Sequence, residues 1–382
     1  MTDNPTKRLT VQSFARKVEH ILLIIISIFL ACTLILVGLL LAWSPGKPQP
    51  FLDENGSLLA GSIAEKVFID VNGVREGMFI KGKNVNNPVL LYLHGGIPDY
   101  FLTQQYPTGW EDHFTVAWWE MRGSGISYNS SIPRETMTLD QMVSDTLEVT
   151  KSLRQRFGKE KIYLMGHSGG TFIAIQAAAR APELYYAYIG VAQMANQLES
   201  EKLAYDYMLA QYKQNGNTSM VRKLEAAPVT LEGGIPQAYL MLRDPGMHPL
   251  GIGTMHGMKS IVTGLILPSF KFREYTLSEK INLWRGKAMA GVSILWKDNL
   301  TTDLSKTLPE LKLPVYFMSG RYDYTCAYPV AKAYFEALKA PVKGFYTFEQ
   351  SAHSPMFEEP GMMVKILVED VLTGTNKLAD YK

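Results

Sequence analysis

The chain has 382 residues, a formal net charge of +2 and a mean hydropathy of −0.03. Hydrophobic residues make up 47% and charged residues 19%, a globular composition that excludes a disordered or collagen-like chain. The 38 basic residues barely outnumber the 36 acidic ones, so there is no basic excess to indicate a nucleic-acid partner. The two cysteines, Cys32 and Cys326, are too few for a disulfide framework or a multi-cysteine zinc site.

The first predicted element is a membrane-spanning helix over residues 21–43, which carry no charge. About 20 apolar residues suffice to cross the hydrocarbon core of a bilayer. A cleaved signal peptide would have a shorter apolar region of about 7–15 residues and a small-residue cleavage site, for which Ala42-Trp43-Ser44 is a poor match. A lipoprotein signal at Cys32 is also disfavoured, because the apolar run continues for ten more positions.

Basic residues in the tail of residues 1–20 predict the orientation of this helix. The excess of Lys and Arg before residue 21 places the N-terminus in the cytoplasm and the remaining chain outside it. A proline-containing linker over residues 44–60 would follow the helix. The sequence therefore predicts a single-pass membrane protein, with the lipid bilayer as one partner and an extracytoplasmic catalytic domain.

Eight segments beyond the linker have the apolar character of strands, and Asn72-Gly73 between the first two is typical of a hairpin turn. The predicted strands cover residues 63–71, 74–81, 89–93, 114–119, 162–165, 187–192, 314–319 and 344–348. The predicted helices among them cover residues 138–157, 171–180, 329–339 and 360–372. This strand–helix alternation indicates an α/β fold built on a mainly parallel sheet of eight strands.

The alternation is interrupted over residues 196–308, which are rich in Met, Tyr, Leu and Gly and show helical stretches. We expect this insertion to form a helical cap over the carboxyl-terminal edge of the sheet, where α/β sheets bind ligands. The α/β core would then consist of residues 61–195 and 309–375, on either side of the cap.

A nucleophilic serine is predicted in Gly166-His167-Ser168-Gly169-Gly170, which matches the G-x-S-x-G pattern. A strand leads into this segment and a small-residue helix leads out of it, as in the sharp turn called a nucleophile elbow. The turn exposes the Ser168 hydroxyl near a helix N-terminus, where the backbone N–H of Gly169 can face a developing oxyanion.

A serine hydroxyl needs a base and an acid to become nucleophilic. His353 follows the last predicted strand, and Asp323 follows the strand before it. The order Ser168, Asp323, His353 is that of an α/β-hydrolase, so we predict these three as a catalytic triad. The weaker candidates are His248 and His256 for the base and Asp298 and Asp303 for the acid.

The loop after the third predicted strand is expected to supply the second oxyanion donor. It reads His94-Gly95-Gly96-Ile97-Pro98, in which glycines let the backbone approach a substrate. We predict an oxyanion hole made by the N–H groups of Gly96 and Gly169, with His94 and Gly95 supporting the loop. Either Gly95 or Gly96 could supply the donor.

These segments resemble the proline iminopeptidase group of α/β-hydrolases, over roughly residues 60–375 and only weakly in the insertion. That group carries H-G-G-P-G, D-Q-R-G-x-G-x-S, the serine elbow and G-R-x-D. The corresponding segments here are His94–Pro98, Glu120–Ser127, Gly166–Gly170 and Gly320–Asp323. The departures are the Ile-Pro-Asp ending of the first motif, Glu-Met in place of Asp-Gln in the second, and Gly169 where Trp is common.

The resemblance implies a helical cap whose acidic residues bind the free amino terminus of a substrate. The insertion contains Glu199, Glu201, Glu225 and Glu232, but none aligns with that role, and we expect most of them to be solvated. Arg122 and Glu120 are expected to brace the loops as an ion pair.

The sequence thus predicts a membrane-anchored serine hydrolase that acts on short peptides or aminoacyl compounds through an acyl-enzyme. A carboxylesterase for apolar esters, an acyltransferase on the same triad, and a binding protein without turnover stay open as alternatives. The predicted chemistry needs no metal or organic cofactor.

Overall fold

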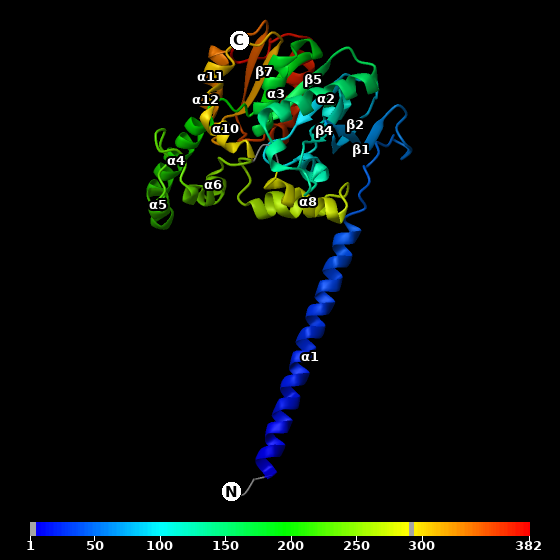
Figure 1. The fold of residues 1–382 in the computed structure, drawn as a ribbon, viewed down its shortest axis with the longest axis vertical. Helices are drawn as coiled ribbons and strands as arrows, with labels where there is room; N and C mark the ends of the chain where they lie inside the picture. The colour runs from blue at the N-terminus through cyan, green and yellow to red at the C-terminus, as the bar shows by residue number, and fades with distance from the viewer. Residues whose placement is uncertain (1–4, 290–293) are drawn as a thin grey trace.

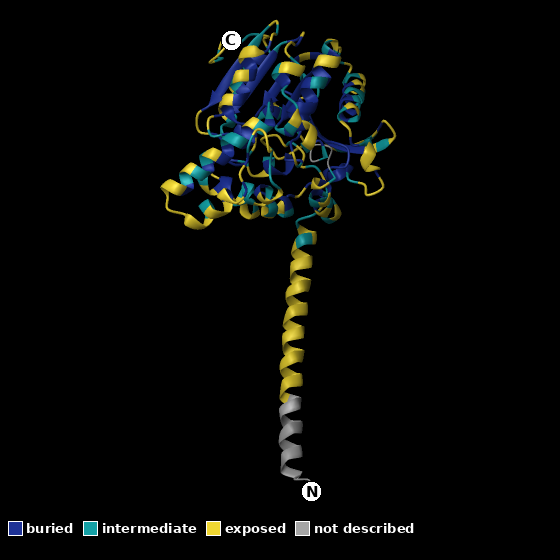
Figure 2. Ribbon diagram, turned by 60° about the vertical axis from the view of Figure 1, so that its left-hand side comes forward, coloured by how far each residue is buried: buried dark blue, intermediate teal, exposed yellow. Residues whose placement is uncertain are grey.

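The structure is a computed structural model that describes residues 5–289 and 294–382. A long helix, α1 (Pro5–Ala42), projects from an α/β domain that contains the rest of the described chain (Figure 1). An 18-residue window within Lys17–Ala42 has a mean hydropathy of 3.1, and none of it is buried in the protein (Figure 2). The helix is therefore long and apolar enough to cross a membrane.

The domain is built on one sheet of eight strands in the order β1-β2-β4-β3-β5-β6-β7-β8. Strand β2 is antiparallel to its neighbours β1 and β4, and the remaining pairs are parallel. The strands are β1 (Ile63–Val71), β2 (Val74–Gly82), β3 (Val89–Leu93), β4 (Thr115–Glu120), β5 (Ile162–His167), β6 (Tyr185–Val191), β7 (Val315–Gly320) and β8 (Lys343–Phe348). This sheet confirms the predicted mainly parallel α/β fold.

The first hairpin forms at the predicted turn. Asn72 and Gly73 have φ values of 48° and 79°, the left-handed conformation that a two-residue turn requires, and Val71 pairs with Val74 across it. Asparagine and glycine are the residues that adopt this conformation most readily. The turn thus sets the register of the two edge strands.

Alternate residues of each central strand enter cores on opposite faces of the sheet. On β3, Leu91 packs in one core and Leu90 in the other. Helices α2, α3 and α12 contribute to the Leu91 side, and α13 and α14 to the Leu90 side. These helices are α2 (Leu139–Phe157), α3 (Gly169–Arg180), α12 (Tyr328–Ala337), α13 (Pro355–Glu358) and α14 (Pro360–Ile366), which continues into the π-helical turn η7 (Leu367–Val371).

The segment between β6 and β7 is helical and contains α4–α8 together with α10 and α11. The bounds are α4 (Gln197–Gln214), α5 (Thr218–Glu225), α6 (Gln237–Leu250), the π-helical turn η6 (Val262–Ile266), α7 (Leu267–Lys271), α8 (Leu277–Lys287), α10 (Trp296–Thr301) and α11 (Leu304–Thr307). Helices α4, α5 and α6 share a small core of their own around Met208 and Tyr239. Helix α8 lies between the sheet and the end of α1, and α5 and α6 lie on the same side of the domain (Figure 1).

The linker after α1 is hydrogen-bonded to this helical cap. The Lys280 ammonium of α8 donates to the Trp43 carbonyl at 2.8 Å, and the Gly46 N–H donates to the Arg273 carbonyl at 3.1 Å. The Gln49 N–H donates to Glu274 at 2.9 Å. The linker therefore runs along the cap.

Candidate active site

Ser168 occupies a strained turn between β5 and α3. Its φ of 55° and ψ of −128° are unusual for a residue with a side chain, and such strain is typical of a nucleophile elbow. A Cβ atom at Gly166 would lie 2.8 Å from the Thr171 backbone nitrogen, and one at Gly170 would lie 2.4 Å from the Leu93 carbonyl oxygen. The two outer glycines of the motif are thus required by close backbone contacts.

The two predicted partners of the serine meet at the same edge of the sheet. The His353 Nδ1 and Asp323 Oδ2 atoms are 2.9 Å apart, although 30 residues separate them in sequence. The other carboxylate oxygen of Asp323 accepts the N–H groups of Thr325 and Cys326 at 2.8 and 2.9 Å. Asp323 is completely buried, so these bonds hold it as a fixed acceptor beside the imidazole.

The His353 ring is in an environment that favours its neutral form. Burial lowers the pKa of His353 below its usual value of 6.5, the nearby Asp323 carboxylate opposes this shift, and the neighbouring His167 and Arg243 charges add to it. A neutral imidazole at neutral pH is what a general base requires.

The glycine loop after β3 lies against the serine. A Cβ atom at Gly95 would be 2.8 Å from the Ser168 Cβ, whereas Gly96 faces open space in the cavity. His94 donates from Nδ1 to the Gly95 carbonyl at 2.7 Å and accepts the Met121 N–H on Nε2 at 3.2 Å. Burial lowers the pKa of His94 to about 4, so the ring that joins these two loops is neutral.

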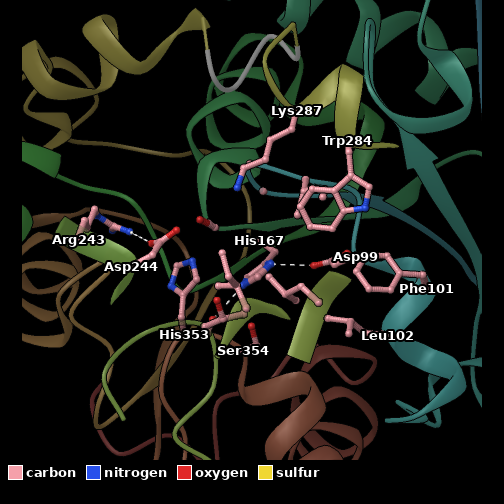
Figure 3. Close-up of a pocket in the computed structure, with 17 residues that line it drawn as sticks. Asp99, Phe101, Leu102, His167, Arg243, Asp244, Trp284, Lys287, His353 and Ser354 are labelled. Atoms are coloured by element: carbon pink, nitrogen blue, oxygen red, sulfur yellow. Dashed lines mark hydrogen bonds and ion pairs between the residues drawn. The ribbon is translucent and has the colours of Figure 1, made fainter. Parts of the chain in front are cut away.

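A cavity with two lobes surrounds Ser168, with volumes of about 200 and 460 Å³. The lobes share Gly96, Ser168, Arg243, Asp244 and Lys287. Apolar side chains dominate the smaller lobe, which includes Ile97, Phe101, Leu102, Ile261, Leu265 and Trp284. In Figure 3 the Trp284 and Leu102 side chains lie on one side of His353, and Arg243 and Asp244 on the other.

Among residues 5–289 and 294–382, no group of three or more His, Cys, Asp or Glu could hold a metal ion.

A second aspartate–histidine pair lies beside the first. The His167 Nδ1 and Asp99 Oδ2 atoms are 3.0 Å apart, and the His167 and His353 ring centroids are 5.0 Å apart (Figure 3). The Nε2 atom of His167 is 2.9 Å from the backbone carbonyl of His353. Both nitrogens of His167 thus face acceptor oxygens, which fix the orientation of the ring.

Asp99 is a buried carboxylate with one satisfied and one unpaired oxygen. Its Oδ2 atom accepts the Tyr92 hydroxyl at 2.7 Å as well as His167, while its buried Oδ1 atom has no partner. Asp99 lines the smaller lobe. The sequence signals were the Asp that ends the glycine loop and the His before the serine, but their mutual contact depends on residues 68 positions apart.

The cap contributes charged residues that no sequence motif identified. Glu201 is completely buried, and both of its carboxylate oxygens accept the Arg243 Nε at 2.9 Å. The expectation of solvation is therefore wrong for Glu201, although Glu199, Glu225 and Glu232 are exposed. Because Arg243 lies on the shared wall of the two lobes, the buried carboxylate sets the position of a guanidinium next to Ser168.

The weaker alternatives for base and acid are held by local contacts instead. His248 bonds to the Asp244 carbonyl and Thr254, and the His256 ring bonds to the Gly251 carbonyl and stacks on Tyr322. Asp303 caps α11 through the Ser305 N–H. Asp298 is in the first turn of α10.

The predicted ion pair between Arg122 and Glu120 is wrong. Arg122 instead donates to both oxygens of Asp145 at 2.6 and 2.9 Å. Glu120 accepts the Tyr275 hydroxyl and the Ile126 N–H. Burial raises the pKa of Glu120 to about 8, which makes it a poor ionic partner near neutral pH.

A sequence model described as the alpha/beta hydrolase fold matches residues 88–360, which span β3 to α14. The chain belongs to the α/β-hydrolase family. A protein named probable aminopeptidase YbaC from Bacillus subtilis (strain 168) is 30% identical over 310 residues, which cover 80% of this chain and 96% of that one. The family model and this relative both support a hydrolase, and the resemblance noted in the sequence is confirmed at the level of the family.

Solved structures of α/β-hydrolases share the fold. A proline iminopeptidase-related protein from Thermus thermophilus has a TM-score of 0.52 at 20% identity, covering 81% of this chain and 98% of that one. A bacterial membrane phospholipase A has a TM-score of 0.54 at 15% identity, covering 97% of this chain and 98% of that one. At these identities the matches establish the architecture alone.

Proposed function

We propose that the chain is a serine hydrolase in which Ser168 is the nucleophile, His353 the base and Asp323 the residue that orients the base. The observation that carries this proposal is the strained Ser168 turn beside the 2.9 Å His353–Asp323 contact, in one cavity. The distance between the two partners is that of a charge-assisted hydrogen bond. Ser168 and His353 both line this cavity, which supports the assignment of the three groups to one site.

The proposed reaction begins when the neutral His353 ring takes the proton of the Ser168 hydroxyl as the oxygen attacks a substrate carbonyl. Asp323 then stabilises the imidazolium that forms, because its own position is fixed by two backbone N–H groups. The leaving amine or alcohol takes the proton back from His353. Water attacks the resulting acyl-enzyme in the same manner and releases the acid.

The Gly96 and Gly169 N–H groups are proposed to bind the oxyanion of the tetrahedral intermediate. Gly169 begins α3 and Gly96 faces the open cavity, so both can point at a carbonyl bound to Ser168. The positive end of the α3 dipole adds to the stabilisation. His94 and Gly95 would hold the loop through their mutual hydrogen bond.

For the substrate we propose a short peptide or aminoacyl compound with an apolar first residue. The smaller lobe combines apolar walls with the lining residue Asp99, whose buried Oδ1 atom has no partner, and Asp244 lines both lobes. A free amino group needs such acceptors. The name of the Bacillus subtilis relative, probable aminopeptidase, agrees with this choice.

Esters of apolar acids are the second candidate. The walls formed by Phe101, Leu102 and Trp284 fit an apolar acyl chain without any need for an amino group. The two candidates differ in the role of Asp99, since an aminoacyl substrate would use the free acceptor and a simple acyl chain would leave it unpaired.

A panel of aminoacyl-naphthylamides and p-nitrophenyl esters, assayed with wild type, Ser168→Ala and Asp99→Asn, tests both levels of the proposal. We expect Ser168→Ala to abolish labelling by a fluorophosphonate probe and to lower kcat by about 10⁶. Equal labelling of wild type and Ser168→Ala would contradict the serine mechanism. If Asp99→Asn lowered kcat/KM equally for the aminoacyl-naphthylamides and the p-nitrophenyl esters, recognition of the amino group by Asp99 would be contradicted.

We also propose that α1 anchors the protein in a bilayer with the catalytic domain outside the cytoplasm. The apolar stretch Lys17–Ala42 supports the anchor, and the basic residues before it support the orientation. Protease accessibility in sealed right-side-out vesicles tests the arrangement. Digestion of the α/β domain is expected, and full protection would contradict this orientation.

A further inference from the structure

The part of the cap nearest to α1 has an unusual outer surface. Lys280 of α8 donates to the carbonyls of Trp43 and Phe270 at 2.8 and 2.7 Å, which joins the end of α1, the end of α7 and the start of α8 at one point. Both ribbon views place these cap helices on the α1 side of the domain (Figures 1 and 2). A membrane surface at the end of α1 would therefore lie next to this part of the cap.

Apolar side chains are exposed on these elements. Val262 in η6, Leu267 at the start of α7 and Ile281 in α8 have 50%, 46% and 45% of their surface exposed. In the same elements, Leu265 of η6 and Leu283 of α8 are buried in the core. We call these three residues, together with the basic residues described next, the anchor-side surface.

The charges around these apolar residues have one sign. The exposed charged side chains between residues 257 and 286 are those of Lys259, Lys271, Arg273 and Arg285. The two acidic residues of this segment are turned inward, because Glu274 pairs with Lys81 at 3.2 Å and Glu279 pairs with Lys66 at 2.8 Å. The outward charge of the anchor-side surface is therefore positive.

The same elements form a wall of the cavity with their inner side chains. Ile261 and Leu265, next to and within η6, and Trp284 of α8 line the smaller lobe. One layer of protein thus has the cavity on one side and an apolar, basic surface on the other. Exposed apolar residues among basic ones are the combination that binds an anionic lipid interface.

We propose that the anchor-side surface binds the headgroup region of an anionic bilayer, so that the cap wall of the cavity is held against the membrane. This inference rests on the proposed anchoring by α1. The apolar side chains of Val262, Leu267 and Ile281 enter the interface, and the basic residues contact lipid phosphates. Lys280 of α8 is bonded to Trp43, a residue type that favours the membrane interface. This contact sets how deeply the anchor-side surface enters the bilayer.

Spin labels on the full-length protein in phosphatidylcholine–phosphatidylglycerol nanodiscs test this surface. The background is Cys32→Ser, since Cys326 is buried, and single labels are placed by Leu267→Cys and Ile281→Cys. The matched control is Tyr186→Cys, which is equally exposed but lies near the start of β6, at the opposite edge of the sheet. We expect oxygen to relax the first two labels more than a water-soluble nickel chelate does, and the reverse at 186.

Charge is tested with Lys271→Glu combined with Arg273→Glu. The ratio of relaxation by oxygen to relaxation by the nickel chelate is expected to fall about twofold at position 281 in this variant. The same fall is expected for the unmodified charges in pure phosphatidylcholine discs. In both cases the electrostatic attraction to anionic lipid is lost. Labels at 267 and 281 that are as accessible to nickel as 186 would overturn the proposal. Labels that are immobilised and dipolar-broadened in detergent would overturn it too, since a second copy would then cover the surface.

Two further measurements separate this inference from the proposed function. A label at Leu34→Cys reports on α1 itself, and a water-exposed position 34 would overturn the anchor together with this proposal. If the label at 34 reports lipid while the labels at 267 and 281 report water, the anchor stands and only the proposed binding of the anchor-side surface is contradicted. The Ser168→Ala protein is expected to give the same label ratios, because binding to the bilayer does not depend on turnover.

Discussion

The sheet edge and the cap each hold a buried carboxylate against a residue that lines the cavity, but they hold it in different ways. At the sheet edge, Asp323 is fixed by two backbone N–H groups of its own turn. In the cap, Glu201 is fixed by the side chains of Gln197, Tyr239 and Arg243, up to 42 residues away. Local turns therefore set the proposed chemistry, whereas long-range side-chain contacts set the cavity wall that would select substrates.

This difference predicts different consequences of mutation. A substitution at the sheet edge can leave the local turn intact and change only the reacting groups. A substitution in the cap leaves a buried partner without its counter-charge, which changes the folding free energy first. The variants below test this distinction.

The largest expected effect is that of Asp323→Asn on turnover. The Asn oxygen can still accept the Thr325 and Cys326 N–H groups, but its NH₂ group would face Nδ1 of His353 and favour the wrong tautomer. We expect kcat to fall by about 10⁴ with an unchanged thermal unfolding midpoint. Asp303→Asn, in a helix cap, is the control and should retain activity. An Asp323→Asn enzyme within tenfold of wild type would contradict the role of Asp323.

The next effect is a loss of stability in Arg243→Met. Glu201 is completely buried, so its carboxylate would lose the Nε donor shared by both of its oxygens without gaining water. We expect the free energy of unfolding in urea to fall by about 3–5 kcal/mol. The exposed Arg222→Met is the matched control.

A double variant, Glu201→Gln with Arg243→Met, removes the buried charge along with its partner. It is expected to regain most of the lost stability while KM stays raised, because the guanidinium on the cavity wall is gone. If the double variant were no more stable than Arg243→Met, the uncompensated charge would not be the cause.

The smallest effect concerns the pH profile. Because burial, together with His167 and Arg243, outweighs Asp323 and lowers the pKa of His353, the neutral base persists to lower pH. The value of kcat/KM should therefore decline on the acid side only below about pH 6.5. His167→Gln removes one of the causes of that lowering. The acid side of the kcat/KM profile should then move to higher pH. At pH 6 the variant should have up to about tenfold less activity than wild type. His113→Gln is the control, and an unmoved acid side in His167→Gln would exclude an electrostatic influence on His353.

Much of the fold could be predicted because its signals are local. Asn72-Gly73 sets the first hairpin, Thr138 accepts the Gln141 N–H at the start of α2, and Gly158 ends that helix at a φ of 59°. The candidate site shares this property. The glycines around Ser168 are needed within the motif itself, and both proposed partners follow strands whose ends meet at one edge.

The remaining contacts could not be predicted because each joins residues from distant segments. Asp99 meets His167 across 68 residues, and Glu120 meets Tyr275 across 155. A carboxylate in a sequence is usually solvated, so nothing in the letters separates the buried Glu201 from the exposed Glu199 two positions earlier. Composition and spacing describe one element at a time, whereas these pairs depend on how elements pack.

Hydrogen bonds along residues 43–49 attach the start of the linker to the α/β domain at several points. Trp43 is bonded to α8, Gly46 to the segment after α7, and Gln49 to both Glu274 and, through its carbonyl, Lys81 of β2. An outward rotation of the cap would pull on the end of α1 or break these bonds, and a change in the tilt of α1 would push on the cap. A change in the orientation of α1 relative to the cap would therefore have to change these hydrogen bonds, beginning with that of Lys280.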